Sequence, residues 1–525
     1  MWNKFIVLLN TIYYLKFVQI LYQVLHRLRH IIGYKRKYSN AYKKTIQLKW
    51  NDGISNIKSF NGNNKFIFIN IEYYFEEDIE WNCSHINKLW NYNLNYFDYL
   101  NQRDITKEQG LSLMLDFSVN YNEINYGKDS YPTSLRIINW VKFIAKHRII
   151  DEILYKIIRE DAQRLSKNLE YHLLGNHLLE NGYALWFAAH FFDDAYYFKL
   201  SKRIITKQLD EQVLKDGGHF ELSPMYHQLM LYRVLDCTRL AQLNPCDSNF
   251  QTLCNLKDKA AEMSAWLEGV SYNSGAIPLV NDSADGVNPD TNTILGYSKS
   301  LGIEWNQSQL LDSGYRMVRR EQYELFIDVG EIGASYQPGH AHADTFNFEL
   351  YINNRPCFVD TGISTYDLGD LRSNERSTRS HNTVTINDRN SSEVWGGFRV
   401  GKRARIINLV EFPQSIEAMH DGYKNYRLNH QRKWEWSENE IVVTDRIIGN
   451  NSRKAKAYFH LHPEISIQKH NDGFIINDNI ELIMRNASLI KITDYEYARE
   501  FNIRYAAKCI EVGFDNHLIT KITIG

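Results

Sequence analysis

The spacing of apolar residues divides the chain into two parts. From about residue 111 to 301, apolar residues recur every three or four positions, the period of amphipathic helices. In the segment 134–150, for example, Leu135, Ile138 and Val141 fall on one stripe. Similar segments follow at 151–172, 177–192, 195–214, 222–243 and 251–270. Their short connections predict an antiparallel helical array, either a bundle or an α/α toroid.

After about residue 313 the apolar period changes to two. Alternating runs cover 323–329 and 346–352, and a short strand then ends at Asp360. Further strand-like runs follow near 383–387, 403–410, 440–447, 456–461 and 481–485. Many short strands separated by turn signals predict an antiparallel β-sandwich. We therefore expect a helical domain over 51–312 and a β-sandwich domain over 313–525.

The first fifty residues form a third, basic segment. Residues 1–50 contain ten Lys or Arg residues and no Asp or Glu, and 5–32 is apolar at helical spacing apart from Lys16, Arg27 and Arg29. Two interpretations remain: a terminal helix docked on the protein body, or an interfacial helix on an anionic membrane. Lys16 argues against a transmembrane span, and no small-residue cleavage site indicates a signal peptide. We expect a protein of the bacterial cytoplasm or membrane surface.

Composition narrows the class of protein. A chain of 525 residues with 44% hydrophobic and 23% charged residues is typical of a soluble multidomain protein. A net charge of −1 gives no overall field to attract nucleic acid. The aromatic share of 13% weakly favours a carbohydrate-binding protein. Six scattered cysteines form no C-x-x-C pair, which predicts free thiols rather than a disulfide framework.

The densest group of chemically active side chains is the sequence GHAHAD at 339–344. If this segment is a strand, His340, His342 and Asp344 face the same side, because residues two apart do so. Downstream, Asp360 ends one strand and His381 begins another. His342, Asp360 and His381 together form a two-imidazole, one-carboxylate set suited to Zn²⁺. The alternative is that these are hydrogen-bonded polar residues of loops.

The helical half contributes the sequence NHLLENG at 176–182. Asn176 is a candidate cap for the helix that follows. His177 and Glu180 are three residues apart, so they share one helix face.

A second motif of the helical half is DGGHFELSPMYH at 216–227, which contains Glu221. Ser223 and Pro224 fit the cap and the first position of a helix. This places Tyr226 near an exposed helix start.

In this order, the motifs resemble those of the heparinase II/III-like lyases and the related oligoalginate lyases. The resemblance spans roughly 85–465 and includes NHLLENG, DGGHFELSPMYH, NDSADG at 281–286, GHAHADTFNFEL at 339–350, VDTG at 359–362, RSTRSHNTV at 376–384 and FHLHPE at 459–464. It implies an α/α toroid followed by an antiparallel β-sandwich. It also implies an enzyme that cleaves uronic-acid polysaccharides by β-elimination.

The resemblance also implies roles for individual residues. Asn176 matches the residue that neutralises the uronate carboxylate, Tyr226 matches the base or acid, and His340 matches the catalytic histidine. His342, Asp360 and His381 match the ligands of a structural zinc. His177 is a further expected active-site residue, and the expected substrate-binding residues are Glu180, Glu221, Arg376, Arg379 and Arg136.

Elimination explains why these residue types are needed. Removing the C5 proton of a uronate places more negative charge beside a carboxylate, and donors such as Asn176 and His177 offset that charge. A base must reach C5 and an acid must protonate the leaving oxygen at C4. Tyrosine has a reference pKa of about 10, so it is a poor base unless nearby cations lower that pKa. The sequence leaves open whether Tyr226 or His340 is the base.

Two other functions fit the same residues. A zinc-dependent hydrolase would use His340, His342, Asp360 and His381 around a metal-bound water. A non-catalytic protein would bind an acidic glycan or take part in polysaccharide assembly. The basic sequence YLKFVQILYQVLHRLRH at 14–30 resembles the leading segment of family members linked to assembly. We expect an acidic polysaccharide as the partner in each case, with peripheral membrane contact through the basic N-terminal helix.

Overall fold

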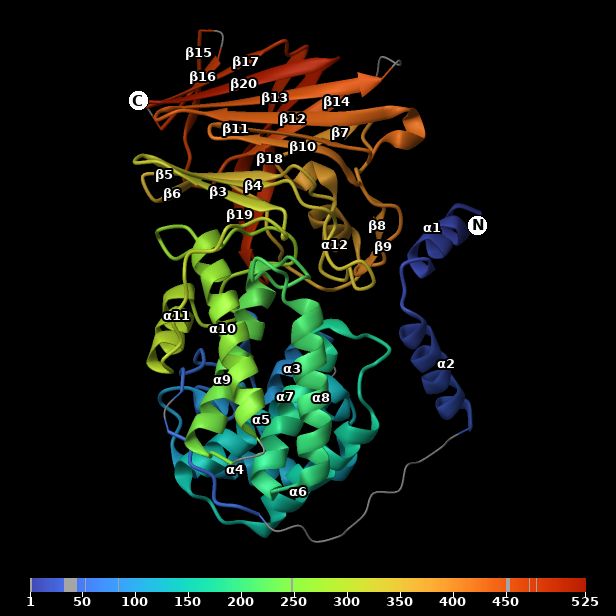
Figure 1. Ribbon diagram of the computed structural model, residues 1–525, viewed down its shortest axis with the longest axis vertical. Coiled ribbons are helices and arrows are strands. Elements are labelled where there is room, and N and C mark those ends of the chain that lie inside the picture. The colour runs from blue at the N-terminus through green and yellow to red at the C-terminus, as the bar shows by residue number, and fades with distance from the viewer. Residues whose placement is uncertain are drawn as a thin grey trace.

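The protein consists of an α/α toroid followed by an antiparallel β-sandwich (Figure 1). The computed structural model describes residues 2–32, 45–51, 53–83, 85–246, 249–449, 454–471, 473–477 and 479–525. The last long helix of the toroid, α11, ends at Ser300, and the first strand of the sandwich, β3, begins at Tyr315. The predicted boundary at residue 312 lies in the connection between them.

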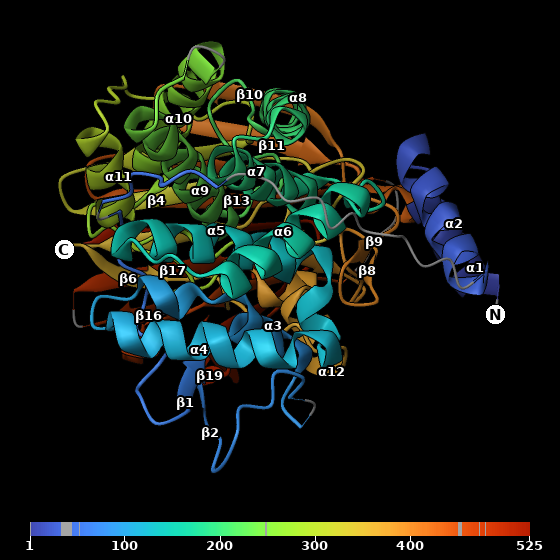
Figure 2. The same ribbon diagram turned by 90° about the horizontal axis from the view of Figure 1, so that it is seen from below.

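The toroid is entered through a small hairpin, β1 (Lys65–Phe68) and β2 (Ile71–Tyr74). Its helices pack side by side below the sandwich (Figures 1 and 2). They are α3 (Lys88–Tyr96), α4 (Lys107–Asn120), α5 (Ser130–His147), α6 (Glu152–Lys167), α7 (Gly175–Phe192), α8 (Ala195–Gln212), α9 (Pro224–Leu243), α10 (Phe250–Val270) and α11 (Thr291–Ser300). The predicted helical segments correspond to α5–α10.

Local sequence sets where several of these helices begin. The side chain of Asp151 accepts hydrogen bonds from two backbone amides at the start of α6, and Asp194 does the same for α8. Thr106 and Gln109 form a capping box at the start of α4. Such caps satisfy amides that have no partner within the helix. Fully buried tryptophans then fill the core between the helices, among them Trp90, Trp140 and Trp186.

The sandwich is built from three antiparallel sheets and one short hairpin. An eight-stranded sheet has the order β10 (Ile406–Phe412), β11 (Ser415–His420), β12 (Leu428–Trp436), β13 (Glu440–Gly449), β20 (His517–Ile524), β17 (Ile480–Arg485), β16 (Gly473–Ile476), β15 (Ile467–His470). A four-stranded sheet has the order β18 (Leu489–Glu500), β19 (Ile503–Phe514), β14 (Ala455–His460), β7 (Val384–Ile386). The third sheet is β3 (Tyr315–Arg319), β4 (Tyr323–Asp328), β5 (Phe348–Ile352), β6 (Arg355–Phe358), and the hairpin is β8 (Val394–Trp395) with β9 (Arg399–Val400).

The third sheet lies between the toroid and the large sheet (Figure 1). Every residue of β4 and β5 is buried, including the polar Glu324 and Asp328. In contrast, β12 alternates strictly between buried and partly exposed positions. Because β4 and β5 are covered on both faces, their alternating sequence does not mark a solvent face.

The N-terminal segment contains two helices rather than the single helix predicted over 5–32. They are α1 (Trp2–Ile12) and α2 (Phe17–Ile32), with a break at 13–16, and residues 33–44 of the predicted basic segment lie outside the described residues. Gln19 of α2 is 2% exposed. It donates hydrogen bonds to the Leu173 carbonyl of the toroid (3.1 Å) and the Tyr336 carbonyl of the sandwich domain (3.4 Å). In the described part of the chain, no helix is both long and apolar enough to cross a bilayer.

Arg136 of α5 is a structural residue of the toroid, which corrects its predicted role in substrate binding. Its side chain is fully buried, with Nε 2.8 Å from Asp161 Oδ2 and one terminal nitrogen 2.7 Å from the Gly127 carbonyl. Asp161 also accepts a hydrogen bond from the Tyr121 hydroxyl (2.7 Å). A substrate therefore has no path to the guanidinium while the toroid is folded.

We predict that Arg136→Met lowers the free energy of unfolding by about 3–5 kcal/mol, because it leaves the Asp161 carboxylate buried without its cation. Urea and thermal unfolding followed by circular dichroism measure the change. The control is Lys156→Met on α6, where an exposed ion pair with Glu160 is removed and a change below about 1 kcal/mol is expected. Equal stability of Arg136→Met and the parent protein would contradict this assignment.

Candidate active site

The predicted catalytic residues come together where toroid helices meet sandwich loops. Asn176 lies in the first turn of α7 and Tyr226 in the first turn of α9. His340 lies in the loop that precedes β5. Residues that are far apart in the sequence thus form one cluster at the junction of the two domains.

Asn176 is held by a glutamate rather than acting as a helix cap. The helix α7 already begins at Gly175, after Leu174 in a left-handed conformation (φ 62°). The Asn176 side-chain amide donates to Glu221 Oε2 (2.9 Å), and its backbone amide lies 3.2 Å from Glu221 Oε1. A Cβ at Gly175 would stand 2.6 Å from the same Oε1 atom, so a glycine allows this close approach. Glu221 therefore fixes the position of Asn176.

His177 is the most accessible of the predicted catalytic imidazoles, with 31% of its side chain exposed. Its Nδ1 lies 3.2 Å from Glu170 Oε1, and its ring packs against the ring of Tyr131 with centroids 4.8 Å apart. Burial disfavours the charged imidazole, but the Glu170 carboxylate outweighs this effect and raises the pKa of His177. His177 is thus biased toward the cation.

Tyr226 and His340 form the centre of the cluster. The predicted start of α9 is confirmed, since the Ser223 hydroxyl accepts from the Tyr226 amide (3.2 Å) and Pro224 occupies the first turn. The rings of Tyr226 and His340 stack with centroids 3.8 Å apart and an angle of 27°. The Tyr226 hydroxyl lies 3.2 Å from the Tyr366 hydroxyl. Burial raises the pKa of Tyr226, so its hydroxyl is protonated at neutral pH.

His340 is oriented by a buried carboxylate, Asp282. Asp282 Oδ2 lies 2.9 Å from His340 Nδ1, and Oδ1 lies 2.8 Å from His342 Nε2. Arg372 donates to both carboxylate oxygens. Burial opposes ionisation, but Arg372 and the two imidazoles outweigh it and hold the pKa of Asp282 well below its ordinary value. Because a carboxylate only accepts hydrogen bonds, His340 Nδ1–H donates to Asp282, and the other ring nitrogen, Nε2, lies 3.6 Å from Glu221 Oε2.

The segment 339–347 is a loop and not the strand that was predicted. The strand β5 begins only at Phe348. His340 and His342 nevertheless meet, because both bind Asp282. Asp344 does not join them: its Oδ2 is buried without a hydrogen-bond partner, and burial raises its pKa to about 6.

Three contributors to the site were not identified from the sequence: Asp282, Arg372 and Tyr366. Asp282 lies within the motif NDSADG, and this motif is the sequence signal that could have identified it as a site residue. Arg372 on the short helix α12 (Asp370–Glu375) and Tyr366 in the preceding loop have no periodic pattern around them. Only the folded loops bring these two side chains to Asp282 and Tyr226.

Two further predicted substrate-binding residues have positioning roles in this structure. Glu180 is fully buried 3.4 Å from the Arg233 guanidinium, and burial raises its pKa to about 7. Arg376 is buried and donates to the Ala341 carbonyl (2.8 Å), between the two site histidines. Burial lowers the pKa of Arg376 to about 10. Both side chains bind protein groups in this structure, and their contact with substrate stays a prediction.

Glu221 and Arg379 complete the set of predicted substrate-binding residues. Glu221 is buried and supports Asn176, and its Oε2 lies 3.6 Å from His340 Nε2. In this structure Glu221 positions Asn176, and its contact with substrate stays a prediction. Arg379 is exposed and its Nε donates to Asn374 Oδ1 (2.7 Å). Its contact with substrate stays a prediction.

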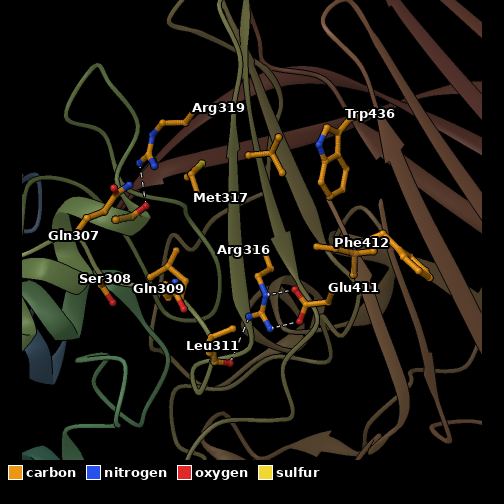
Figure 3. A pocket seen from close by; sticks show the side chains of 14 residues that line it. Gln307, Ser308, Gln309, Leu311, Arg316, Met317, Arg319, Glu411, Phe412 and Trp436 are labelled. Atoms are coloured by element: carbon orange, nitrogen blue, oxygen red, sulfur yellow. Dashed lines mark hydrogen bonds and ion pairs between the residues drawn. The ribbon is translucent and has the colours of Figure 1, made fainter. Parts of the chain in front are cut away.

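The cluster is almost closed in this structure. Asn176 is 2% exposed and the His340 side chain is 11% exposed. A separate pocket near β3 and β10 is shown in Figure 3, where Arg316 pairs with Glu411. None of the predicted catalytic residues lines that pocket. The partly exposed groups of the cluster are His177 and Tyr226.

Comparison with known proteins identifies the family. The model described as "Heparinase II/III N-terminus" matches residues 130–299, and the model described as "Heparinase II/III-like, C-terminal" matches 302–512. The chain belongs to the heparinase II/III-like family. The two matched ranges correspond to the toroid from α5 onward and to most of the β-sandwich.

Relatives and solved structures agree with this family. A heparin-sulfate lyase of Bacteroides stercoris is 23% identical over 331 residues, which cover 55% of this chain and 46% of the relative. A heparin-sulfate lyase of Bacteroides thetaiotaomicron is 25% identical, and the match covers 49% of this chain and 42% of that relative. The chain thus spans less than half the length of these relatives. A heparinase III crystal structure matches with a TM-score of 0.66 at 16% identity, covering 86% of this chain and 80% of the other, which shows a shared fold.

The zinc expected for this heparinase II/III-like protein has no ready ligand set in the structure. His342 and His381 have ring centroids 5.3 Å apart, but His342 Nε2 faces Asp282 while His381 Nδ1 contacts Asp360 Oδ2 at 2.7 Å. Asp360 Oδ2 also accepts from Asn347 (2.7 Å). Across the described ranges, no three His, Cys, Asp or Glu side chains are arranged to hold a metal. His342 Nδ1 and His381 Nε2 are nevertheless buried without a hydrogen-bond partner among the described residues. Zinc binding by His342, Asp360 and His381 therefore stays a prediction, and no catalytic step below depends on it.

The zinc prediction is tested by metal analysis of the protein purified without chelators. Zinc binding at His342, Asp360 and His381 predicts about one zinc per chain, lost in His381→Ala and accompanied by a lower melting temperature. His517→Ala, which changes the first residue of strand β20 in the sandwich, is the matched control and retains the metal. A zinc-free parent protein, even after growth with added zinc, would refute the site.

Proposed function

We propose that this protein is a polysaccharide lyase that cleaves a uronic-acid-containing polysaccharide by β-elimination, leaving an unsaturated uronate end. The observation that carries the proposal is the stacked pair of Tyr226 and His340, with Asp282 on the far side of the imidazole. This places a protonated phenol beside an imidazole whose Nδ1–H binds a buried carboxylate. The printed names of the relatives, heparin-sulfate lyases, support the reaction type.

His340 is the proposed base that removes the C5 proton. Its Nδ1–H is engaged by Asp282, which fixes the tautomer and leaves Nε2 as the acceptor of the proton. The Asp282 carboxylate then stabilises the imidazolium that forms, as a carboxylate does behind the histidine of a serine protease. Arg372 keeps Asp282 ionised and aligned throughout.

Tyr226 is the proposed acid that protonates the leaving oxygen at C4. Its raised pKa keeps the hydroxyl protonated before the reaction, which suits an acid better than a base. Tyr366, with its hydroxyl 3.2 Å away, is placed to hydrogen-bond the Tyr226 oxygen when that proton leaves. Base and acid come from one side of the site, because their rings are stacked on each other.

Asn176 and His177 provide the proposed recognition of the uronate carboxylate. The Asn176 Nδ2 group carries two hydrogens and donates one of them to Glu221, so the second is the donor proposed for the carboxylate, while His177 is biased toward the cation. A cation and an amide at this position offset the charge that develops when C5 loses its proton. The proposed partner is therefore an acidic polysaccharide, and nucleic acid is not expected.

The proposed reaction predicts a product that absorbs in the near ultraviolet. The purified protein is incubated with a panel of uronate polymers beside Tyr226→Phe and His340→Ala. We expect the parent protein to generate the absorbance and each variant to reduce it by at least about 100-fold, since each removes a proton-transfer group. Tyr196→Phe, an exposed tyrosine of α8, is the matched control and retains activity.

Full activity of Tyr226→Phe would refute the assigned mechanism. Binding of an acidic glycan that stays intact over long incubation would instead favour a non-catalytic glycan-binding protein. Measuring glycan mass beside absorbance separates that outcome from a panel that lacks the native substrate.

We predict a second, more specific loss of activity in Asp282→Asn. The amide keeps the shape of the carboxylate but no longer fixes the His340 tautomer, so kcat falls by about 100- to 10,000-fold with little change in KM. Asp285→Asn, three residues later and paired with Arg499 at the surface, is the matched control with near-parental kcat. A variant with unchanged kcat would mean that Asp282 does not orient the base.

A further inference from the structure

The two N-terminal helices expose an apolar surface on the outside of the molecule. In α2, Phe17, Ile20, Leu21, Val24 and Leu28 are all exposed, and Phe17 is 77% exposed. Their spacing places them on one stripe of the helix. Five further large apolar side chains between Ile6 and Tyr13 are exposed as well. Both views place α1 and α2 at the outer edge of the molecule (Figures 1 and 2).

The helix α2 is docked on the protein by its other side. Gln19 donates to carbonyls of both domains, as described above. Tyr22 packs against Tyr171 with ring centroids 4.9 Å apart, and His26 packs against His172 at 4.6 Å. The side of α2 that contacts the protein thus carries Gln19, two aromatic rings and the partly buried Val18, whereas the stripe from Phe17 to Leu28 faces outward. This is the reverse of an ordinary surface helix, whose apolar stripe faces the core.

The charge of the segment identifies the kind of surface that covers this stripe. Residues 1–50 contain ten Lys or Arg residues and no Asp or Glu, although the whole chain has a net charge of −1. Arg27 is exposed beside the stripe, within one turn of Val24 and Leu28. Lys16, before the stripe, is paired with Glu211 of the toroid, but the segment itself carries no acidic residue. An apolar stripe on a segment whose charged residues are all basic matches a bilayer with anionic headgroups, in which apolar side chains enter the acyl region and cations contact the headgroups.

We propose that α1 and α2 form a docking surface for an anionic lipid bilayer. The helices lie in the interface plane, with the stripe from Phe17 to Leu28 inserted and the polar side of α2 still bound to the protein. This inference is independent of the lyase reaction. It affects that reaction only through the position of the bilayer. Gln19 of α2 binds the Leu173 carbonyl, and Leu173 is only three residues before Asn176. The bilayer would then lie beside the junction that carries the catalytic cluster.

Vesicle sedimentation of the full chain tests the proposal. The probes are vesicles of phosphatidylcholine with phosphatidylglycerol and vesicles of phosphatidylcholine alone. We expect binding to the anionic vesicles, at least about tenfold weaker binding to the neutral ones, and weakening by salt. The double variant Phe17→Glu/Val24→Glu should lose at least about tenfold in binding, because it places two anions within the stripe.

A matched control separates the stripe from exposed apolar residues in general. Val119→Glu/Ile150→Glu introduces the same charges at two exposed toroid positions and should bind as the parent protein does. Melting temperatures check that each variant is folded, and cleavage of a soluble glycan should be equal in the parent and both double variants.

Three results would overturn the proposal. The first is an absence of anionic-vesicle binding, and the second is equal binding by the parent and Phe17→Glu/Val24→Glu. The third is self-association in solution that the same variant abolishes, because a second copy of the chain would then be the occupant of the stripe. Each outcome stands whether or not any glycan is cleaved.

Discussion

Asp282 accepts hydrogen bonds from His340, His342 and Arg372, and each of these three side chains belongs to the sandwich domain. Asp282 itself belongs to the toroid, in the connection between α10 and α11. Its backbone amide also binds the His340 carbonyl (3.0 Å), and its carbonyl accepts from the Ser223 hydroxyl (2.7 Å). One residue therefore joins the two domains, the start of the Tyr226 helix and the catalytic histidine.

A buried carboxylate is stable only when its charge is paired and its oxygens are hydrogen-bonded. Arg372 provides the charge and the two imidazoles provide further donors, so the cost of burying Asp282 is offset by contacts that also orient His340. The same logic applies on the toroid side, where Glu221 fixes Asn176. The site thus holds His340 between two carboxylates, with Asp282 at Nδ1 and Glu221 Oε2 3.6 Å from Nε2, and Glu221 also binds Asn176.

Much of this architecture was predictable from the sequence, because it depends on local periodicity. The helices α5–α10 and strands such as β4, β13 and β17 follow apolar spacing closely. The break between α1 and α2 includes Lys16, which interrupts the apolar run, but a single polar residue at helical spacing does not by itself predict the end of a helix. The full burial of β4 was also hidden, because it depends on which domain covers the sheet.

The residues of the site also separate into those that local sequence predicts and those that only the fold brings together. Motifs identified Asn176, Tyr226 and His340, since each lies in a short segment of unusual composition. Asp282, Arg372 and Tyr366 take part only through contacts between distant segments, as no local pattern marks them. Arg136 and Arg376 were assigned to the substrate because arginine suits anions, but burial gives them protein partners instead.

The central claim is that the glycosidic bond is broken by proton transfer from C5 and not by water. Digestion of a susceptible uronate polymer in heavy-oxygen water, followed by mass spectrometry of the products, tests this most directly. The account predicts unsaturated ends and, in digests shorter than the exchange of the anomeric oxygen with water, no heavy oxygen in either new chain end, because no water is added. Heavy oxygen at the new reducing end, with saturated products, would identify hydrolysis and contradict the roles given to His340 and Tyr226.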